Sequence, residues 1–389
     1  MKYPDTCVNM NEELRSIVGR LFIPTPPLPE NFIKFFTRLA LQHAEHHRMI
    51  AKKYLYDAKP RQLDFGFLHG DSLNAVAYAT KVDETPSFDF IGINHGAPTT
   101  LLTTFFNMLA RRDIFPQVGD IDLELEEVLP ADYLSSNVIR QGIHINEPQC
   151  PVRRVFAEEL MNIAFDFLYF HELAHLKNGH LEVWRQNSNA IAIVEVSNVK
   201  DLPCHSLRRT LEAHADRGGV EGALYELHNK HLGLAKYKDE APAEYYQGRL
   251  ALCESVTSTT LSTIFAIYVV FRLFHEDYAD PVRQSTEPYP RPDVRFCSIL
   301  KATLSHHAHF SRSEQHSEGL FEMQIVQTAV NAEIACSAIW GGEVDAKLLI
   351  GAALKELPIF EAEFNETWTK IRPSLDKYKR GSILDAMRL

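Results

Sequence analysis

The sequence lacks closely spaced cysteines and an excess of basic residues, and each absence narrows its possible function. Its six cysteines are scattered along 389 residues, at Cys7, Cys150, Cys204, Cys253, Cys297 and Cys336. This spacing resembles neither a disulfide framework nor a Cys-x-x-Cys metal knuckle, so we expect reduced thiols in a cytoplasmic protein. The formal net charge of −11 argues against a nucleic-acid partner, because nucleic-acid binding relies on basic patches.

The sequence also lacks a hydrophobic run long enough to be an obvious membrane span. Its first residues lack the apolar segment of a signal peptide, so we expect no secretory leader. Residues 255–271 are uncharged, but Ser and Thr dominate their first half. The strongly apolar part, 261–274, is shorter than the roughly 20 residues that cross a bilayer. We therefore predict a buried core helix there rather than a membrane anchor.

The hydrophobic pattern predicts many helices and a few short strands. Strands are expected over 63–68, 74–80, 89–94, 121–128 and 189–197, where short runs are bounded by turn-forming residues. Helices are expected over 11–20, 31–56, 95–112 and 152–178, and over most of the chain after 206. Gly179 ends the long helix over 152–178, as glycine commonly does just past a helix.

Histidines gather on the helix predicted over 31–56. His43 and His47 are four residues apart and share one face of that helix. No acidic partner with the spacing of a zinc site lies near them in the sequence. We therefore predict no metal site at these histidines.

The pentapeptide HELAH at 171–175 lies inside the long helix predicted over 152–178. His171 and His175 project from the same face, so both imidazoles can meet one metal ion. Glu172 is rotated away from that face by one residue, which suits a base acting on water better than a third ligand. Two histidines in a polar pocket of a helix are the alternative interpretation of the pentapeptide alone.

A catalytic zinc site needs three protein ligands and one open position. In metzincins the third histidine follows the first by ten residues, after a glycine at seven, but here those places hold Leu181 and Asn178. The next candidates are Glu212 and Asp216, which share a face of a helix predicted over 206–230. Glu212 can supply a carboxylate ligand, and Asp216 can accept a hydrogen bond from a ligating histidine. The alternative is that both are solvated helix charges.

His214, between these two carboxylates, points to the opposite side of the helix and is not expected to be a ligand.

HExxH followed by Glu-x-x-Ala-Asp at 212–216 resembles the compact gluzincin metallopeptidases, including soluble HtpX-like enzymes and minigluzincins. The segments 74–77 and 90–93 resemble the strand pair that precedes the active helix in that group. There the edge strand holds an extended substrate by strand addition. Tyr289-Pro290 and Arg295 fall where these enzymes often carry His-Pro and Arg. The Lit-type phage-exclusion peptidases are a looser comparison.

This resemblance implies zinc held by His171, His175 and Glu212, with Glu172 as general base. It also implies a zincin-like metallopeptidase core of the α+β class, mainly helical, with three or four strands beside the active-site helix. Tyr289 departs from the usual histidine, and its hydroxyl either stabilises an oxyanion or belongs to a turn without a catalytic role.

The sequence thus predicts a helical segment over 1–60, a metallopeptidase core over 61–310 and a second helical segment over 311–389. The expected activity is zinc-dependent hydrolysis of peptide bonds in a protein or peptide substrate, with zinc favoured over other divalent ions by the His-His-Glu ligand set. Two alternatives stay open: a non-catalytic zinc-binding regulatory or interaction protein, and a peptidase that acts on a single partner after a signal. Oligomeric state does not follow from the sequence.

Overall fold

The chain folds as a set of helices around one small sheet. The computed structural model describes residues 41–51, 62–80, 88–126, 146–188, 192–194, 205–275, 291–310, 318–340 and 352–380. Within these ranges the protein is mainly helical, which confirms the predicted α+β class. The strands are β1 (Gln62–Leu68), β2 (Ala75–Ala79), β3 (Phe88–Asn94) and β4 (Ala192–Val194).

Ten α-helices are found in the described part of the chain. They are α3 (Gln42–Ala51), α4 (Gly96–Leu109), α5 (Pro151–Lys177), α6 (His180–Ser188), α7 (His205–Tyr237), α8 (Ala243–Cys253), α9 (Val256–His275), α10 (Pro292–Phe310), α11 (Glu318–Trp340) and α13 (Leu357–Tyr378). A short 3-10 turn, η3 (Ile121–Leu123), and a π-helical turn, η5 (Ala352–Glu356), complete the elements.

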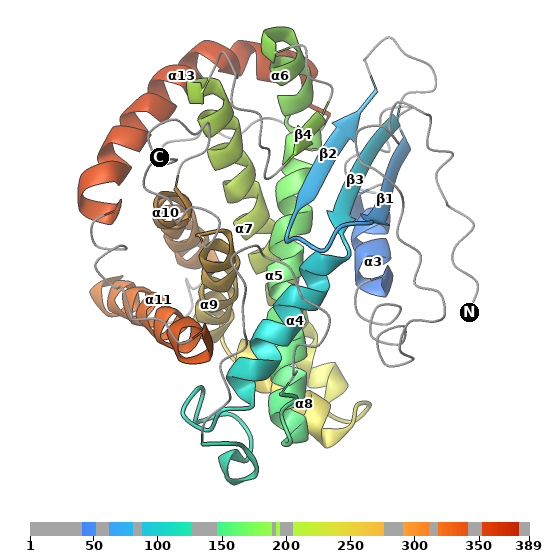
Figure 1. The fold of residues 1–389 in the computed structure, drawn as a ribbon, viewed down its shortest axis with the longest axis vertical. Helices are drawn as coiled ribbons and strands as arrows, with labels where there is room; N and C mark the ends of the chain where they lie inside the picture. Colours follow the sequence, from blue (N-terminus) through green and yellow to red (C-terminus); the bar gives the residue numbers. More distant parts are fainter. Residues whose placement is uncertain are drawn as a thin grey trace.

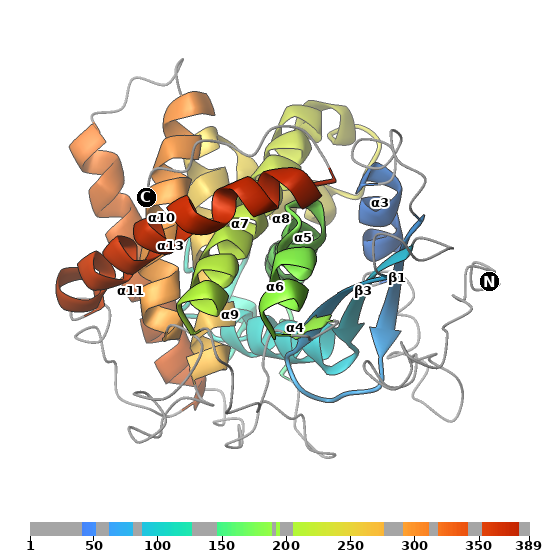
Figure 2. The same cartoon turned by 90° about the horizontal axis from the view of Figure 1, so that it is seen from above.

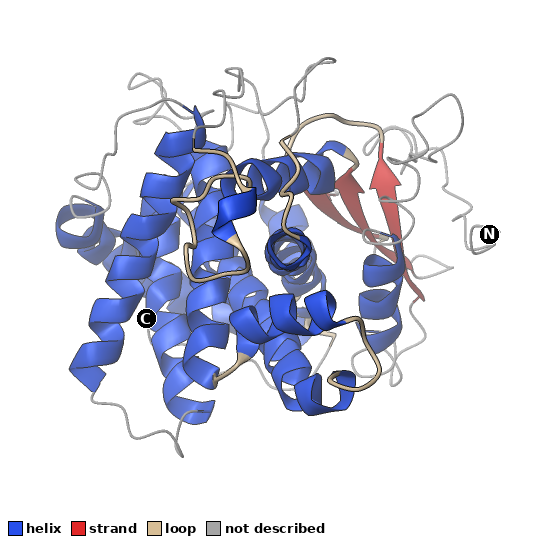
Figure 3. Cartoon of the chain, turned by 90° about the horizontal axis from the view of Figure 1, so that it is seen from below, coloured by secondary structure: helices blue, strands red, loops and turns tan. Residues whose placement is uncertain are grey.

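Helix α5 occupies the centre of the molecule, between the sheet and the other long helices (Figure 1). It packs against α4, α7, α8 and α9 and against strands β2 and β3. Seen from above, α13 crosses over α7 and reaches α6 (Figure 2). The view from below shows the strands gathered on one side of the helices (Figure 3). The helix that carries HELAH is therefore covered from several directions.

The sheet has the order β1-β3-β2-β4. Strand β1 runs parallel to β3, whereas β2 is antiparallel to both β3 and β4. Ala77 of β2 is opposite Ile91 of β3 on one side and Ile193 of β4 on the other. The resemblance placed an edge strand within the pair β2 and β3, but both are interior strands of the described sheet. Its edges are β1 and the short strand β4.

Both ends of α5 are fixed by residues distant in the sequence. At its start, the Glu124 carboxylate accepts hydrogen bonds from the backbone N–H groups of Gln149 and Cys150, at 3.1 and 2.9 Å. At its end, Gly179 has φ +75°, which confirms the predicted glycine stop. Arg380 donates to the last carbonyls of the helix, where the negative end of the helix dipole favours a cation.

Two glycines allow α7 to approach α5 closely. A Cβ atom at Gly218 would lie 2.6 Å from the Cβ of Ala174, and one at Gly222 would lie 2.3 Å from Cγ of Phe170. Any larger residue at these positions would push the helices apart. The absence of side chains there brings the carboxylates of α7 within reach of the histidines of α5.

Helix α9 contains the apolar residues 261–274, for which the sequence predicts a buried core helix rather than a membrane anchor. Val256–Phe274 is, within the described ranges, the one helix long and apolar enough to cross a membrane. However, 78% of this segment is buried inside the protein, against α5, α7, α8, α10 and α11. Its threonines Thr259, Thr260 and Thr263 donate to backbone carbonyls four residues earlier, which satisfies their hydroxyls inside the core. The segment is a core helix of this fold.

The prediction of a strand over 121–128 is wrong for residues 121–126, which are the ones that the structure describes. Residues 121–123 form the turn η3, and the Asp120 carboxylate accepts a hydrogen bond from the backbone N–H of Asp122 at 3.1 Å. Leu125 makes an isolated bridge with Arg111. Alternating leucines and acidic residues imitate a strand, but aspartate favours a turn here. Two further differences are that α4 ends at Leu109 rather than near 112, and that α7 continues to Tyr237.

Several predicted elements lie wholly or partly outside the described residues. These are the helix over 11–20, the parts of the 31–56 helix around α3, and the ends of the 189–197 strand around β4. Helices α11 and α13, from the predicted C-terminal segment, pack against α4 and α9 and against α6, α7 and α10 respectively.

Candidate metal centre

Three side chains from two helices direct one ligand atom each toward a common point. The Nε2 atoms of His171 and His175 lie 3.1 Å apart. Oε2 of Glu212, on α7, lies 3.3 Å from Nε2 of His171 and 3.6 Å from Nε2 of His175. The structure thus brings together all three residues that the sequence singled out as metal ligands.

These distances fit a bound metal ion. With zinc–nitrogen and zinc–oxygen bonds of about 2.0–2.2 Å, the edges of a tetrahedron around zinc measure about 3.3 Å. The three distances between the ligand atoms, 3.1, 3.3 and 3.6 Å, lie on both sides of that value. A point about 2 Å from all three atoms therefore exists, and the donor set of two imidazoles and one carboxylate is one that zinc uses. The group can hold a metal ion with one coordination position left over.

Glu212 is held in its orientation by Arg208, one helical turn earlier on α7. Nε of Arg208 lies 2.6 Å from Oε1 of Glu212, which leaves Oε2 toward the histidines. Burial alone would raise the pKa of Glu212, but the charge of Arg208 and the contacts with His175 and His171 lower it well below its ordinary value. The carboxylate is therefore ionised and ready to bind a cation.

His171 is oriented by Asp216. Nδ1 of His171 lies 3.0 Å from Oδ1 of Asp216, so an Nδ1–H donor leaves the lone pair of Nε2 facing the common point. Both carboxylate oxygens of Asp216 accept hydrogen bonds from Arg295 of α10, at 2.7 and 2.8 Å. The structure shows the contact between Asp216 and His171, one of the two candidate ligands, that the helix spacing predicted.

His175 is oriented by another histidine rather than by a carboxylate. Its Nδ1 lies 2.9 Å from Nδ1 of His180, and Nε2 of His180 lies 2.9 Å from Nδ1 of His214. One proton on each imidazole is enough for both hydrogen bonds: His175 donates to His180, and His180 donates to His214. Burial lowers the pKa of His175 and of His180, and it lowers that of His214 to about 3, so all three rings stay neutral. A neutral His175 keeps Nε2 available as a ligand.

Sequence reasoning did not find Arg208 or the role of His180. Arg208 precedes Glu212 by four residues, and this helical spacing could have indicated the ion pair. His180 follows the helix end at Gly179, and its approach to His175 depends on the turn, for which the sequence held no signal. His214, which was not expected to be a ligand, lies outside the metal-binding group and contacts His180.

The residues with proposed catalytic roles are placed as follows. Glu172 is 1% exposed, and the three ligands are 0–2% exposed, so the whole centre is buried. Tyr289 lies outside the described residues.

Comparison with protein-family models, curated proteins and solved structures gave no match to this chain.

Proposed function

We propose that this protein is a zinc-dependent metallopeptidase of the gluzincin type. The observation that supports the proposal most strongly is the spacing of three ligand atoms, 3.1–3.6 Å apart, with the acid Glu172 next to the first ligand in the chain. Under this proposal, the sheet and helices α5 and α7 form a zincin-like core, and the substrate is a protein or peptide.

Zinc bound at this centre would lower the pKa of a coordinated water and polarise the scissile carbonyl group. His171, His175 and Glu212 would hold the ion, while Asp216 and His180 keep the two imidazoles in the tautomer with Nε2 unprotonated. Glu172 would accept a proton from the attacking water and return it to the leaving amine. Arg208 and Arg295 offset the negative charge of the carboxylates in the buried site.

The test compares the wild type with Glu172→Gln in a proteome-wide cleavage screen and on generic peptides. We expect new protein termini with the wild type, none with the variant, and equal zinc content in both. Glu172→Gln is nearly isosteric, so its loss of cleavage would reflect the missing base. Equal cleavage by the two proteins would contradict the assignment of Glu172.

A second candidate function is that of a non-catalytic zinc-binding regulatory or interaction protein. The observation that favours it is the burial of Glu172 and all three ligands, because a peptide can reach such a centre only after a covering segment moves. Stoichiometric zinc without any cleavage in the screen, including in lysates that hold natural partners, would favour this second function.

A further inference from the structure

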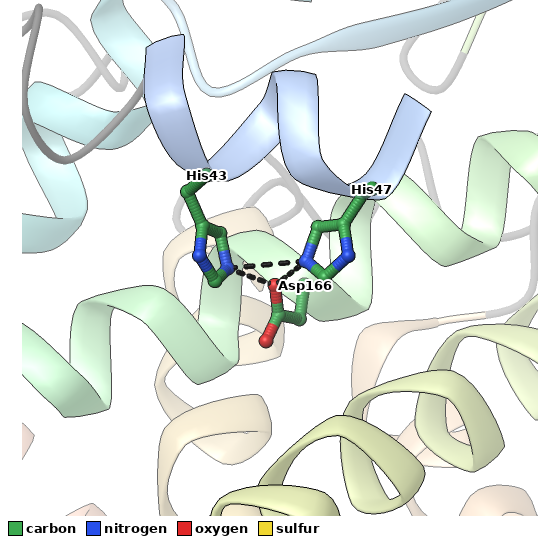
Figure 4. Close-up of side chains that lie close together, drawn as sticks. All are labelled: His43, His47 and Asp166. Atoms are coloured by element: carbon green, nitrogen blue, oxygen red, sulfur yellow. Dashed lines mark hydrogen bonds and ion pairs between the residues drawn. The ribbon is translucent and has the colours of Figure 1, made fainter. Parts of the chain in front are cut away.

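A second pair of histidines faces a carboxylate from another helix. His43 and His47 of α3 project from one face of the helix toward Asp166 of α5 (Figure 4). Oδ1 of Asp166 lies 2.5 Å from Nε2 of His47 and is also in hydrogen-bond contact with Nε2 of His43. The sequence indicated no carboxylate near these histidines, because Asp166 is 119 residues from His47.

This group repeats the pattern of the first centre. In both, two histidines four residues apart present Nε2 atoms separated by 3.1 Å, and one carboxylate oxygen faces the pair. In the group on α3, however, the carboxylate is closer than the about 3.3 Å edge expected around zinc, so it would retreat by roughly 1 Å on binding an ion. Both imidazoles now contact the same oxygen, which brings two N–H donors close together. A metal ion that bound both Nε2 atoms would take the place of protons there.

The protonation states in the group suit a cation, and the nearby ammonium group of Lys230 is paired with Glu159 at 3.0 Å. His43 keeps a neutral ring, because burial lowers its pKa. Burial would raise the pKa of Asp166, but the two imidazoles beside it lower the pKa far below the ordinary range. Glu226 is also nearby, and burial raises its pKa. A neutral His43 ring and an ionised Asp166 carboxylate are protonation states that metal ligands need.

A cavity borders this group at His43. A cavity of about 970 Å³ lies beside α3 and the first half of α5, and His43 is part of its wall. Five glutamates line it, against two arginines: Glu147, Glu158, Glu159, Glu240 and Glu244. A wall with more acidic than basic groups raises the local concentration of cations. A hydrated ion can therefore reach the accessible side of His43, whose side chain is 16% exposed.

We propose that His43, His47 and Asp166 form a second metal site for a divalent transition-metal ion such as zinc. The ion binds Nε2 of each histidine and a carboxylate oxygen of Asp166, with water from the cavity completing its coordination. The ion connects α3 to α5 at Asp166, which lies five residues before His171 of HELAH. The site thereby links the N-terminal part of the chain to the helix of the first centre, without depending on peptidase activity.

Metal content tests the proposal. The chelator-stripped full-length chain is reloaded with Zn²⁺, freed of excess metal, and analysed for zinc per chain. We expect two ions in the wild type, one in Asp166→Asn and one in His43→Ala. His46→Ala is the matched control, because His46 is exposed on the same helix, and it should retain two.

The variant His171→Ala distinguishes the two sites. It should lose the ion of the first centre and keep the ion bound by His43, His47 and Asp166. If the first centre binds no zinc, the wild type would hold one ion, Asp166→Asn none and His171→Ala one, and the second site would still stand. Equal zinc content in wild type, Asp166→Asn and His43→Ala would overturn the proposal.

Hydrogen exchange gives a second measurement, which does not depend on counting ions. Amides of 42–51 should exchange at least severalfold more slowly with Zn²⁺ than without it in the wild type and in Glu172→Gln. In folded Asp166→Asn the ion should have no such effect. Zinc protection of α3 that persists in Asp166→Asn would also overturn the proposal.

Discussion

Arg208 and Glu212 form an ion pair one helical turn apart on α7, with 2.6 Å between Nε and Oε1. This contact turns Oε2 of Glu212 toward the two histidines of α5. Both side chains are buried, at 3% and 0% exposed, so water cannot replace either partner. The orientation of Glu212 in the candidate metal-binding group therefore depends on an arginine that is not itself part of the group.

Replacing Arg208 by glutamine should weaken zinc binding at the first centre by about 10–100-fold, because residues that orient metal ligands have effects of that size. Chelator competition in an Asp166→Asn background measures this centre alone. The control is Arg209→Gln, since Arg209 pairs with Glu363 at 2.5 Å, away from the ligands. Equal zinc affinity in the two variants would contradict the role given to Arg208.

Replacing Asp216 by asparagine should also reduce zinc affinity about 10–100-fold, because His171 loses the acceptor that fixes its tautomer. The variant should melt at a lower temperature as well, since Arg295 is left buried without its charged partner. Asp293→Asn is the control, because Asp293 binds Arg291 at 3.0 Å rather than a metal ligand. A variant with wild-type zinc affinity would show that Asp216 does not orient His171.

Gly222→Ala should destabilise the fold by about 1–3 kcal/mol, because the new methyl group would overlap the ring of Phe170 on α5. Urea denaturation measures the loss. The same change combined with Phe170→Ala should be less destabilising than the sum of the two single changes, since the smaller side chain makes room. Additive losses would mean that the two residues do not determine how closely α5 and α7 approach.

Glu159→Gln should reduce stability at neutral pH. The buried Glu159 carboxylate lies 3.0 Å from Nζ of Lys230 and 2.9 Å from Arg249. Burial would raise its pKa, but these two cations lower it from 4.5 to about 2. A depressed pKa stabilises the fold above pH 4.5, by about 3 kcal/mol here, and this contribution is lost as the pH falls toward 2.

Denaturation at pH 7 and at pH 3 checks this dependence. The gap in free energy of unfolding between wild type and Glu159→Gln should be widest at pH 7 and narrower at pH 3. Glu366→Gln, in an exposed pair with Lys370, should leave the stability unchanged at both values. A gap that is the same at both pH values would contradict the assigned ion pair.

The sequence predicted those parts of the fold and site that depend on local spacing. The position of HELAH on a helix and the shared face of Glu212 and Asp216 follow from helical periodicity, and the first three strands follow from short runs between turn residues. These patterns need no knowledge of how distant elements pack.

Features that depend on distant contacts were missed. The approach of Asp166 to His43 and His47, and that of His180 to His214, join residues 34 to 123 positions apart. The interior position of β2 depends on β4, which pairs with it from more than 100 residues downstream. Such contacts are fixed by packing, including the close approach of helices at Gly218 and Gly222, and no local pattern encodes them.

Zinc content per chain shows whether His171, His175 and Glu212 together hold a zinc ion. Folding of the wild type, His175→Ala and Glu212→Ala is first verified by circular dichroism, and the reloaded proteins are then analysed. We expect each variant to hold one zinc ion fewer than the wild type. Folded variants with as much zinc as the wild type, or a folded wild type that takes up no zinc, would contradict it.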